Sequence, residues 1–188
     1  MKFYKQAALT GIVLILLGKV EAANAKTQPE IKDSNLVAPK TMTIDRSLSK
    51  SKSEQIIRAA QLYYTFWNTG DTIYLDAVIA PDFKDNTLPE DRPQGPEGLK
   101  AASENFRTAV PNLSCSLEDL LVVGDKVTAR LIFRGTFEGK FMDHAPTNEP
   151  VEFIAIDILH IKNGRLIEDW HLEDNLTLMK QLQAVQIQ

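Results

Sequence analysis

The sequence predicts an α+β fold in which N-terminal helices pack in a curved antiparallel sheet. Three segments with helical spacing occupy residues 53–110, and strand-like segments follow from residue 115 onward. Both faces of the last two strand-like segments are largely apolar, so the sheet has to be covered on both sides. Helices that precede an antiparallel meander are typical of the α+β class.

The predicted helices are amphipathic and have recognisable ends. The first begins at Ser53, a suitable N-cap, carries apolar and aromatic side chains at three- and four-residue spacing, and ends before Gly70. A shorter helix is expected over residues 72–80, and a polar, proline-containing loop follows over 82–95. The third helix, residues 97–110, lies between two prolines that favour its start and its end.

Four strands and a closing helix are expected in the second half of the chain. They are residues 115–123, 126–137, 151–161, 165–174 and, for the helix, 175–183. Asn163 and Gly164 supply the positive φ angles of a two-residue hairpin turn, which would place Lys162 opposite Arg165.

Counting outward from this turn predicts which side chains share a face of the hairpin. One face combines apolar residues with three carboxylates and a Trp: Phe153, Ala155, Asp157, Leu159, Ile161, Leu166, Glu168, Trp170, Leu172 and Asp174. The other face holds Ile154, Ile156, Ile158, His160, Ile167, Asp169, His171 and Glu173. An acid on an apolar face must ionise at a desolvation cost, accept hydrogen bonds, or stay protonated with a raised pKa, as in pockets that do proton chemistry.

Residues 1–25 are expected to be a signal peptide. Lys2 and Lys5 precede an apolar run over residues 7–17, and a small-x-small cleavage site ends at Ala25. The run is shorter than the ~20 residues of a membrane span, so no stable membrane insertion is expected after cleavage, although an uncleaved anchor is an alternative. The mature protein would be periplasmic or secreted, with a flexible linker over residues 26–51 and one domain over 52–188.

Charge and cysteine content exclude some classes of function. The formal net charge is −4, and removing residues 1–25 leaves 18 basic against 24 acidic residues, or −6, which argues against a nucleic-acid partner. Cys115 is the only cysteine, so no internal disulfide can form. The three histidines, His144, His160 and His171, match no metal-site spacing, and no metal is expected.

From Glu54 to Leu182 the sequence resembles the SnoaL-like polyketide cyclases, or ester cyclases, of the nuclear-transport-factor-two-like superfamily. The motifs that carry the resemblance are YYTFWNTGD from Tyr63, APDFKDN from Ala80, GPEGLKA from Gly95, VPNLSCSLEDLLVVGDKVTARL from Val110, GTFEGKFM from Gly135 and DILHIKNGRLIEDWHLED from Asp157. The resemblance implies a cone-shaped α+β barrel around a deep apolar pocket, a homodimer formed through sheet surfaces, and chemistry without a metal or organic cofactor.

The resemblance also implies an aldol closure of a polyketide ester in which a pocket aspartate is general acid and base. Asp174 is the residue matched to that aspartate. His160, fourteen residues earlier, has the spacing of the partner histidine, although the predicted register puts it on the opposite face unless a bulge intervenes. Many relatives carry histidine where this chain has Asn86 and Phe137, so two pocket imidazoles would be missing.

Each candidate has a plainer alternative. Asp174 also suits an N-cap of the last helix, Trp170 suits packing as well as ligand stacking, and Asp157 or Glu168 suits a buried ion pair with Arg130. The residues expected to bind substrate are Asp157, Glu168, Trp170, Arg130, Asn86, Phe137, Tyr63 and Trp67.

Three hypotheses of function follow. The first is an exported protein that binds a small apolar, carbonyl-bearing molecule and catalyses cyclisation, isomerisation or hydration. The second is a carrier or sensor with the same pocket and no turnover. The third is a protein-interaction module that uses the sheet face and leaves a large apolar patch uncovered by any homodimer. In a homodimer, the face with Ile154, Ile156 and Ile158 would meet the partner subunit.

Overall fold

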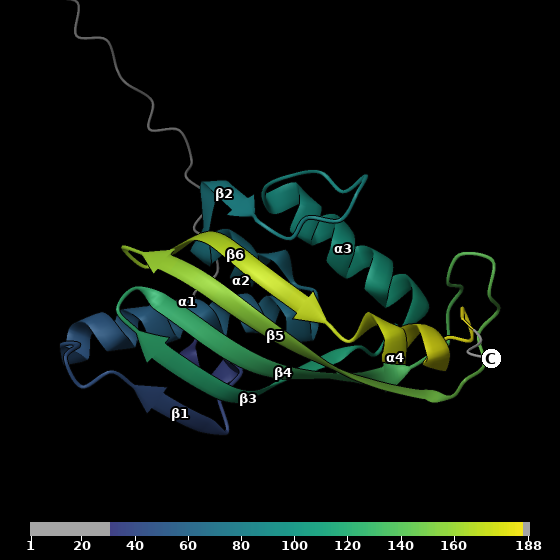
Figure 1. Ribbon diagram of the computed structural model, residues 1–188, viewed down its shortest axis with the longest axis horizontal. Helices are drawn as coiled ribbons and strands as arrows, with labels where there is room; N and C mark the ends of the chain where they lie inside the picture. Colours follow the sequence, from purple (N-terminus) through teal and green to yellow (C-terminus); the bar gives the residue numbers. More distant parts are fainter. Residues whose placement is uncertain (1–30, 186–188) are drawn as a thin grey trace, which may run out of the picture. The chain divides into compact units, whose positions relative to one another are not determined.

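Six strands form one sheet in the order β1-β3-β4-β5-β6-β2, shown in Figure 1 for the computed structural model, which describes residues 31–185. The strands are β1 (Thr41–Ile44), β2 (Ile79–Asp85), β3 (Ser114–Val123), β4 (Lys126–Thr136), β5 (Pro150–Lys162) and β6 (Arg165–Glu173). The predicted signal peptide, residues 1–25, lies outside the described residues.

The α+β class predicted from the sequence is confirmed, but the sheet does not close into a barrel. β3, β4, β5 and β6 form the predicted antiparallel meander. β1 and β2 remain at opposite edges of the curved sheet, and each pairs in parallel with its neighbour. Both edge strands belong to the helical half of the chain, and they reach their neighbours through long connections of the kind that parallel pairing requires.

The helices are α1 (Lys50–Thr69), α2 (Thr72–Val78), α3 (Pro96–Ala109) and α4 (Asn175–Gln181). In Figure 1 α1 and α2 lie behind the strands. α1 begins earlier than expected because Ser49, not Ser53, is its N-cap, accepting a hydrogen bond from the amide of Lys52. Gly70 ends α1 with φ 75°, a conformation that favours glycine. None of the helices in the described part of the chain is long and apolar enough to cross a membrane.

Residues 31–51 are part of the domain, so the predicted flexible linker is wrong over this range. Leu36 is buried, and the amide of Val37 donates to the hydroxyl of Thr65 on α1, at 2.9 Å. β1 then pairs with β3. No sequence signal reveals this strand, because its side chains are mostly exposed and backbone pairing at a sheet edge holds it.

β2 is a second strand that the sequence did not predict. Residues 82–85 were expected in a loop, but Phe83 and Asp85 are buried and β2 pairs with β6. The remaining segment, residues 86–95, is the predicted loop and connects β2 to α3.

The hairpin of β5 and β6 has the predicted turn but contains a bulge. Lys162 pairs with Arg165 and Ile161 with Leu166, as expected. The register then shifts, so that His160 lies opposite Glu168. Because side chains alternate between faces, this one-residue shift moves the rest of β6 onto the opposite face from the one predicted.

Candidate functional site

A pocket lies between α1, α3 and the inner face of the sheet, and one wall of it is aromatic. Phe133 stacks on Phe153 with ring centroids 5.1 Å apart, and Phe106 also stacks on Phe153, with centroids 6.1 Å apart. Trp67 of α1 contacts both Phe133 and Tyr63 edge to face. These rings line the pocket. The aromatic lining suits an apolar ligand.

Ionisable side chains line the other part of this pocket. Asp157 comes from β5, His171 and Glu173 come from β6, and Arg92 comes from the loop 86–95. The register places Asp157 directly opposite His171, so their side chains are neighbours on the inner face. The pocket therefore brings acid, base and cation together beside an apolar surface.

Asp157 is the most deeply buried of these ionisable groups, with 4% of its surface exposed. Burial, followed by the nearby charges of Asp169 and Glu173, raises the pKa of Asp157 to about 8. Its Oδ1 atom has no hydrogen-bond partner among the residues that the structure describes. The hydroxyl of Tyr64, also buried without a partner among these residues, is close enough to Asp157 to lower its pKa and is a candidate donor within the protein. Asp157 also lines the pocket, where a ligand can meet its carboxyl group.

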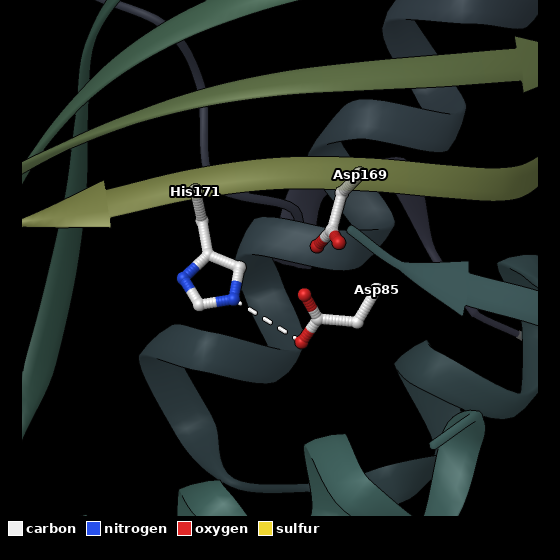
Figure 2. Close-up of side chains that lie close together, drawn as sticks. All are labelled: Asp85, Asp169 and His171. Carbon is white, nitrogen blue, oxygen red and sulfur yellow. Dashed lines mark hydrogen bonds and ion pairs between the residues drawn. The ribbon is translucent and has the colours of Figure 1, made fainter. Parts of the chain in front are cut away.

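His171 is held between two carboxylates. Its Nδ1 lies 2.8 Å from Glu173 Oε1, and its Nε2 lies 3.1 Å from Asp85 Oδ2, the contact drawn in Figure 2. Burial disfavours the imidazolium, but the hydrogen bonds to Asp85 and Glu173 outweigh it and raise the pKa of His171 to about 10. At neutral pH His171 is therefore a cation beside Asp157.

Asp85, at the end of β2, organises the polar part of the pocket. Its Oδ1 accepts from the amide and the hydroxyl of Thr87, while its Oδ2 contacts both His171 and Arg92. Burial alone would raise its pKa, but these partners hold the pKa of Asp85 below its ordinary value. Two cations thus share one buried carboxylate.

Asp169 lies behind His171 and is fully buried. Its Oδ2 accepts a hydrogen bond of 2.9 Å from the hydroxyl of Tyr63. Burial and the charge of Asp85 raise the pKa of Asp169 to about 6. Tyr63 thereby connects the aromatic wall to the ionisable groups.

Asp85, Asp169 and His171 place one ligand atom each within 4.8 Å of one another and point toward a common space, as Figure 2 shows. This set suits a metal ion poorly. Both ring nitrogens of His171 already contact carboxylates, Nδ1 that of Glu173 and Nε2 that of Asp85. The guanidinium of Arg92 already pairs with Asp85. The geometry favours an internal ion-pair network at these residues.

Three of the residues predicted from the sequence line this pocket: Asp157, Tyr63 and Trp67. Asp174, predicted as the pocket acid, does not line this pocket. Asp174 instead caps α4, accepting from the amide of Thr177 at 3.0 Å and its hydroxyl at 2.7 Å. It follows the last inner-face residue, Glu173, and lies at the end of the strand.

The predicted residues His160, Glu168 and Asn86 meet on the outer face. His160 Nδ1 lies 2.8 Å from Glu168 Oε1, and the amide of Asn86 donates to Glu168 Oε2 at 3.2 Å. His160 Nε2 contacts Asp125 at 2.9 Å. None of the four lines the pocket. The bulge does place His160 next to a carboxylate, but this carboxylate belongs to Glu168 on the outer face and not to Asp174.

The remaining predicted substrate-binding residues also lie outside the pocket lining. Trp170 is on the outer face, where the ammonium of Lys126 lies 4.8 Å from its ring centroid. Arg130 is exposed and opposite Ile156, so it forms no buried ion pair with Asp157 or Glu168. Phe137 is fully buried in the core. Phe137 is away from the pocket because it packs in the core. Trp170 and Arg130 are away from it because the strand register turns them to the outer face.

Sequence reasoning missed Asp85, Arg92, Asp169, His171 and Glu173. The last three alternate along one strand, at every second position, and this repeat of two acids around a histidine is a signal that a face of ionisable groups exists. No glycine or proline marks the bulge that turns this face inward. Asp85 and Arg92 come from a strand end and a loop, where spacing along the chain gives no information about distance in space.

The fold and the pocket together define a small α+β protein built to enclose an organic molecule. The sequence pattern of the SnoaL-like polyketide cyclases matches residues 57–182, and the chain belongs to this family.

Solved structures agree with this assignment. A candidate polyketide cyclase from Bacillus cereus is 52% identical, with a TM-score of 0.73, over 80% of this chain and 95% of that chain. TsrD from Streptomyces laurentii is 29% identical, with a TM-score of 0.62, over 74% of this chain and 100% of that chain. IdmH, a candidate polyketide cyclase from Streptomyces antibioticus, is 28% identical, with a TM-score of 0.59, over 70% of this chain and 97% of that chain. None of the curated proteins matches the chain significantly.

Proposed function

We propose that the pocket binds a small apolar, carbonyl-bearing molecule and catalyses an acid–base step of the cyclase or isomerase type. The observation that carries this proposal is Asp157, a buried carboxyl group with an unpartnered oxygen in an aromatic-lined pocket. Membership of a family of polyketide cyclases supports a reaction at a carbonyl compound.

Asp157 suits the transfer of a proton to and from carbon. A pKa of about 8 makes its carboxylate a stronger base than an ordinary aspartate, and leaves both protonation states populated near neutral pH. As base, Asp157 takes a proton from the carbon next to the carbonyl. It returns that proton to the oxygen formed when the enolate carbon attacks a second carbonyl, or to carbon in an isomerisation.

His171 suits the stabilisation of the enolate. It lies opposite Asp157 in the register and is an imidazolium held by Asp85 and Glu173. A fixed cation beside the position where negative charge develops lowers the barrier without reorganisation. The two residues thus divide the work: Asp157 moves the proton and His171 holds the charge.

The test is deuterium exchange at the methyl group of 2-acetylnaphthalene, an apolar aryl ketone, followed by NMR across pH. We expect kcat/KM to rise with pH until Asp157 ionises near about 8, and to fall above about 10 as His171 loses its proton. If the protein binds a set of ketones but their deuterium exchange is no faster than in buffer, catalysis is contradicted and the carrier hypothesis is supported. Asn86 and Phe137 do not bear on that choice, because neither lines the pocket.

We also propose that two copies of the chain pair through the outer face of β5. Ile154, Ile156 and Ile158 follow one another on this face and are 47%, 39% and 39% exposed. A row of exposed isoleucines on a sheet is typical of a surface that is covered in the assembly. The row is continuous, so two copies can bury it against itself as a two-fold dimer requires.

The dimer is tested by light scattering after size-exclusion chromatography. We expect Ile156→Lys to be a monomer because its ammonium would be buried in the interface. Met142→Lys, at an exposed residue outside the sheet, serves as control and should remain a dimer. A monomeric parent protein would contradict the dimer and would support the hypothesis that this face binds a different protein.

A further inference from the structure

The loop 86–95 is built to hold Arg92 at the pocket. The side-chain amide of Gln94 accepts from the backbone amide of Asp85 at 2.7 Å and donates to the backbone carbonyl of Asp85 at 2.9 Å. On the other side, α3 packs directly on the loop, since a Cβ on Gly98 would meet the carbonyl oxygen of Pro93 at 1.9 Å. The loop is therefore fixed at both ends of the segment that carries Arg92.

Arg92 has donors that the protein does not use. A guanidinium carries five N–H groups in a planar fork. One terminal nitrogen, Nη2, pairs with Asp85 and also lies 3.1 Å from His171 Nε2, whereas Nε is buried and has no hydrogen-bond partner within residues 31–185. The side chain is 16% exposed and lines the pocket. The enclosed Nε is out of reach of a ligand, but the other terminal nitrogen makes no hydrogen bond to these residues and is not enclosed, so an acceptor in the pocket can pair with it.

The charges around the pocket leave room for an anion. Arg92 and His171 are the cations that line it. Glu173 is engaged by His171, and Asp85 lies behind both cations. Asp157 is mostly protonated below pH 8. A negative group on a ligand would thus meet two cations, the carboxylate of Glu173, which His171 already neutralises, and the neutral carboxyl of Asp157.

We propose that the pocket selects aromatic molecules that carry a carboxylate, and that Arg92 is the residue that sets this preference. The ring system lies on the Phe133 and Phe153 wall, and the carboxylate accepts from the guanidinium. This inference rests on the proposed function of the same pocket and names the class of its ligand.

The experiment compares 2-naphthoate with methyl 2-naphthoate by calorimetry at about pH 6, where the acid is ionised and Asp157 is neutral. We expect the parent protein to bind the acid roughly 10-fold more tightly than the ester, because a charge-assisted bond is lost in the ester. Arg92→Gln should remove this preference, so that the acid and the ester bind with equal affinity. Arg92→Lys should keep part of it, since the charge remains without the fork. Lys84→Gln, an exposed cation on β2, is the matched control.

Each result decides between the hypotheses. Equal or tighter binding of the ester to the parent protein overturns the inference and leaves the proposed function intact, and this comparison needs no variant. Retention of the acid preference in a folded Arg92→Gln protein assigns it to another residue. Failure of both compounds to bind contradicts the inference and the proposed function together.

Discussion

Replacing Asp157 by Asn is expected to lower kcat/KM for proton exchange by about 10²–10⁴-fold, the usual contribution of a general acid or base. Asn fills the same space and can donate a hydrogen bond, but it cannot take a proton from carbon. Ligand affinity should change little because the aromatic wall remains. The measurement is the NMR exchange assay, together with calorimetric binding of the same ketone.

The matched control for this variant is Asp174→Asn. Asp174 caps α4 and does not line the pocket, and Asn is as good an N-cap as Asp. We expect full activity and nearly unchanged stability. If Asp174→Asn loses exchange while Asp157→Asn keeps it, the pocket described here is not the site of the reaction.

Replacing Asp85 by Ala is expected to destabilise the protein by about 3–5 kcal/mol, the cost of leaving buried charges without their partner. Asp85 is 4% exposed, and its loss leaves Arg92 and His171 without their shared acceptor and Thr87 without its own. The free energy of unfolding is measured by urea denaturation, with the slope compared to confirm the same transition.

Asp82→Ala is the control for Asp85→Ala. Asp82 is exposed on the same strand, so its replacement should change the free energy of unfolding by no more than about 0.5 kcal/mol. Equal effects of the two variants would show that Asp85 does not organise the pocket. A loss of naphthoate binding in Asp85→Ala protein that is still folded would show that Asp85 also positions Arg92.

The local signals in the sequence were sufficient for most elements of the fold. The helical spacing of aromatic residues predicted α1, and Asn163-Gly164 predicted the turn between β5 and β6. Alternation placed Asp157 on an apolar inner face, where it lies. Each of these predictions rests on interactions between residues close in the chain, or on a period that the backbone imposes.

The edge strands and the polar half of the site could not be predicted from such local signals. β1 and β2 are held by backbone pairing with distant strands, and their own side chains carry little pattern. Arg92 reaches the pocket because Asp85 and Gln94 fix the loop 86–95. These contacts exist only in the folded chain, so the sequence does not reveal them.

Local patterns along the chain were enough to predict the α+β class, the hairpin turn, the aromatic first helix and the buried position of Asp157. The rest of the site depends on how distant segments pair in the folded protein. A single bulge between β5 and β6 exchanged the faces of β6, so that His171 and Glu173 line the pocket while Glu168 and Trp170 face outward. The physical reason is that side chains in a strand alternate with a period of two, so one extra residue, unmarked in the sequence, reverses every assignment beyond it.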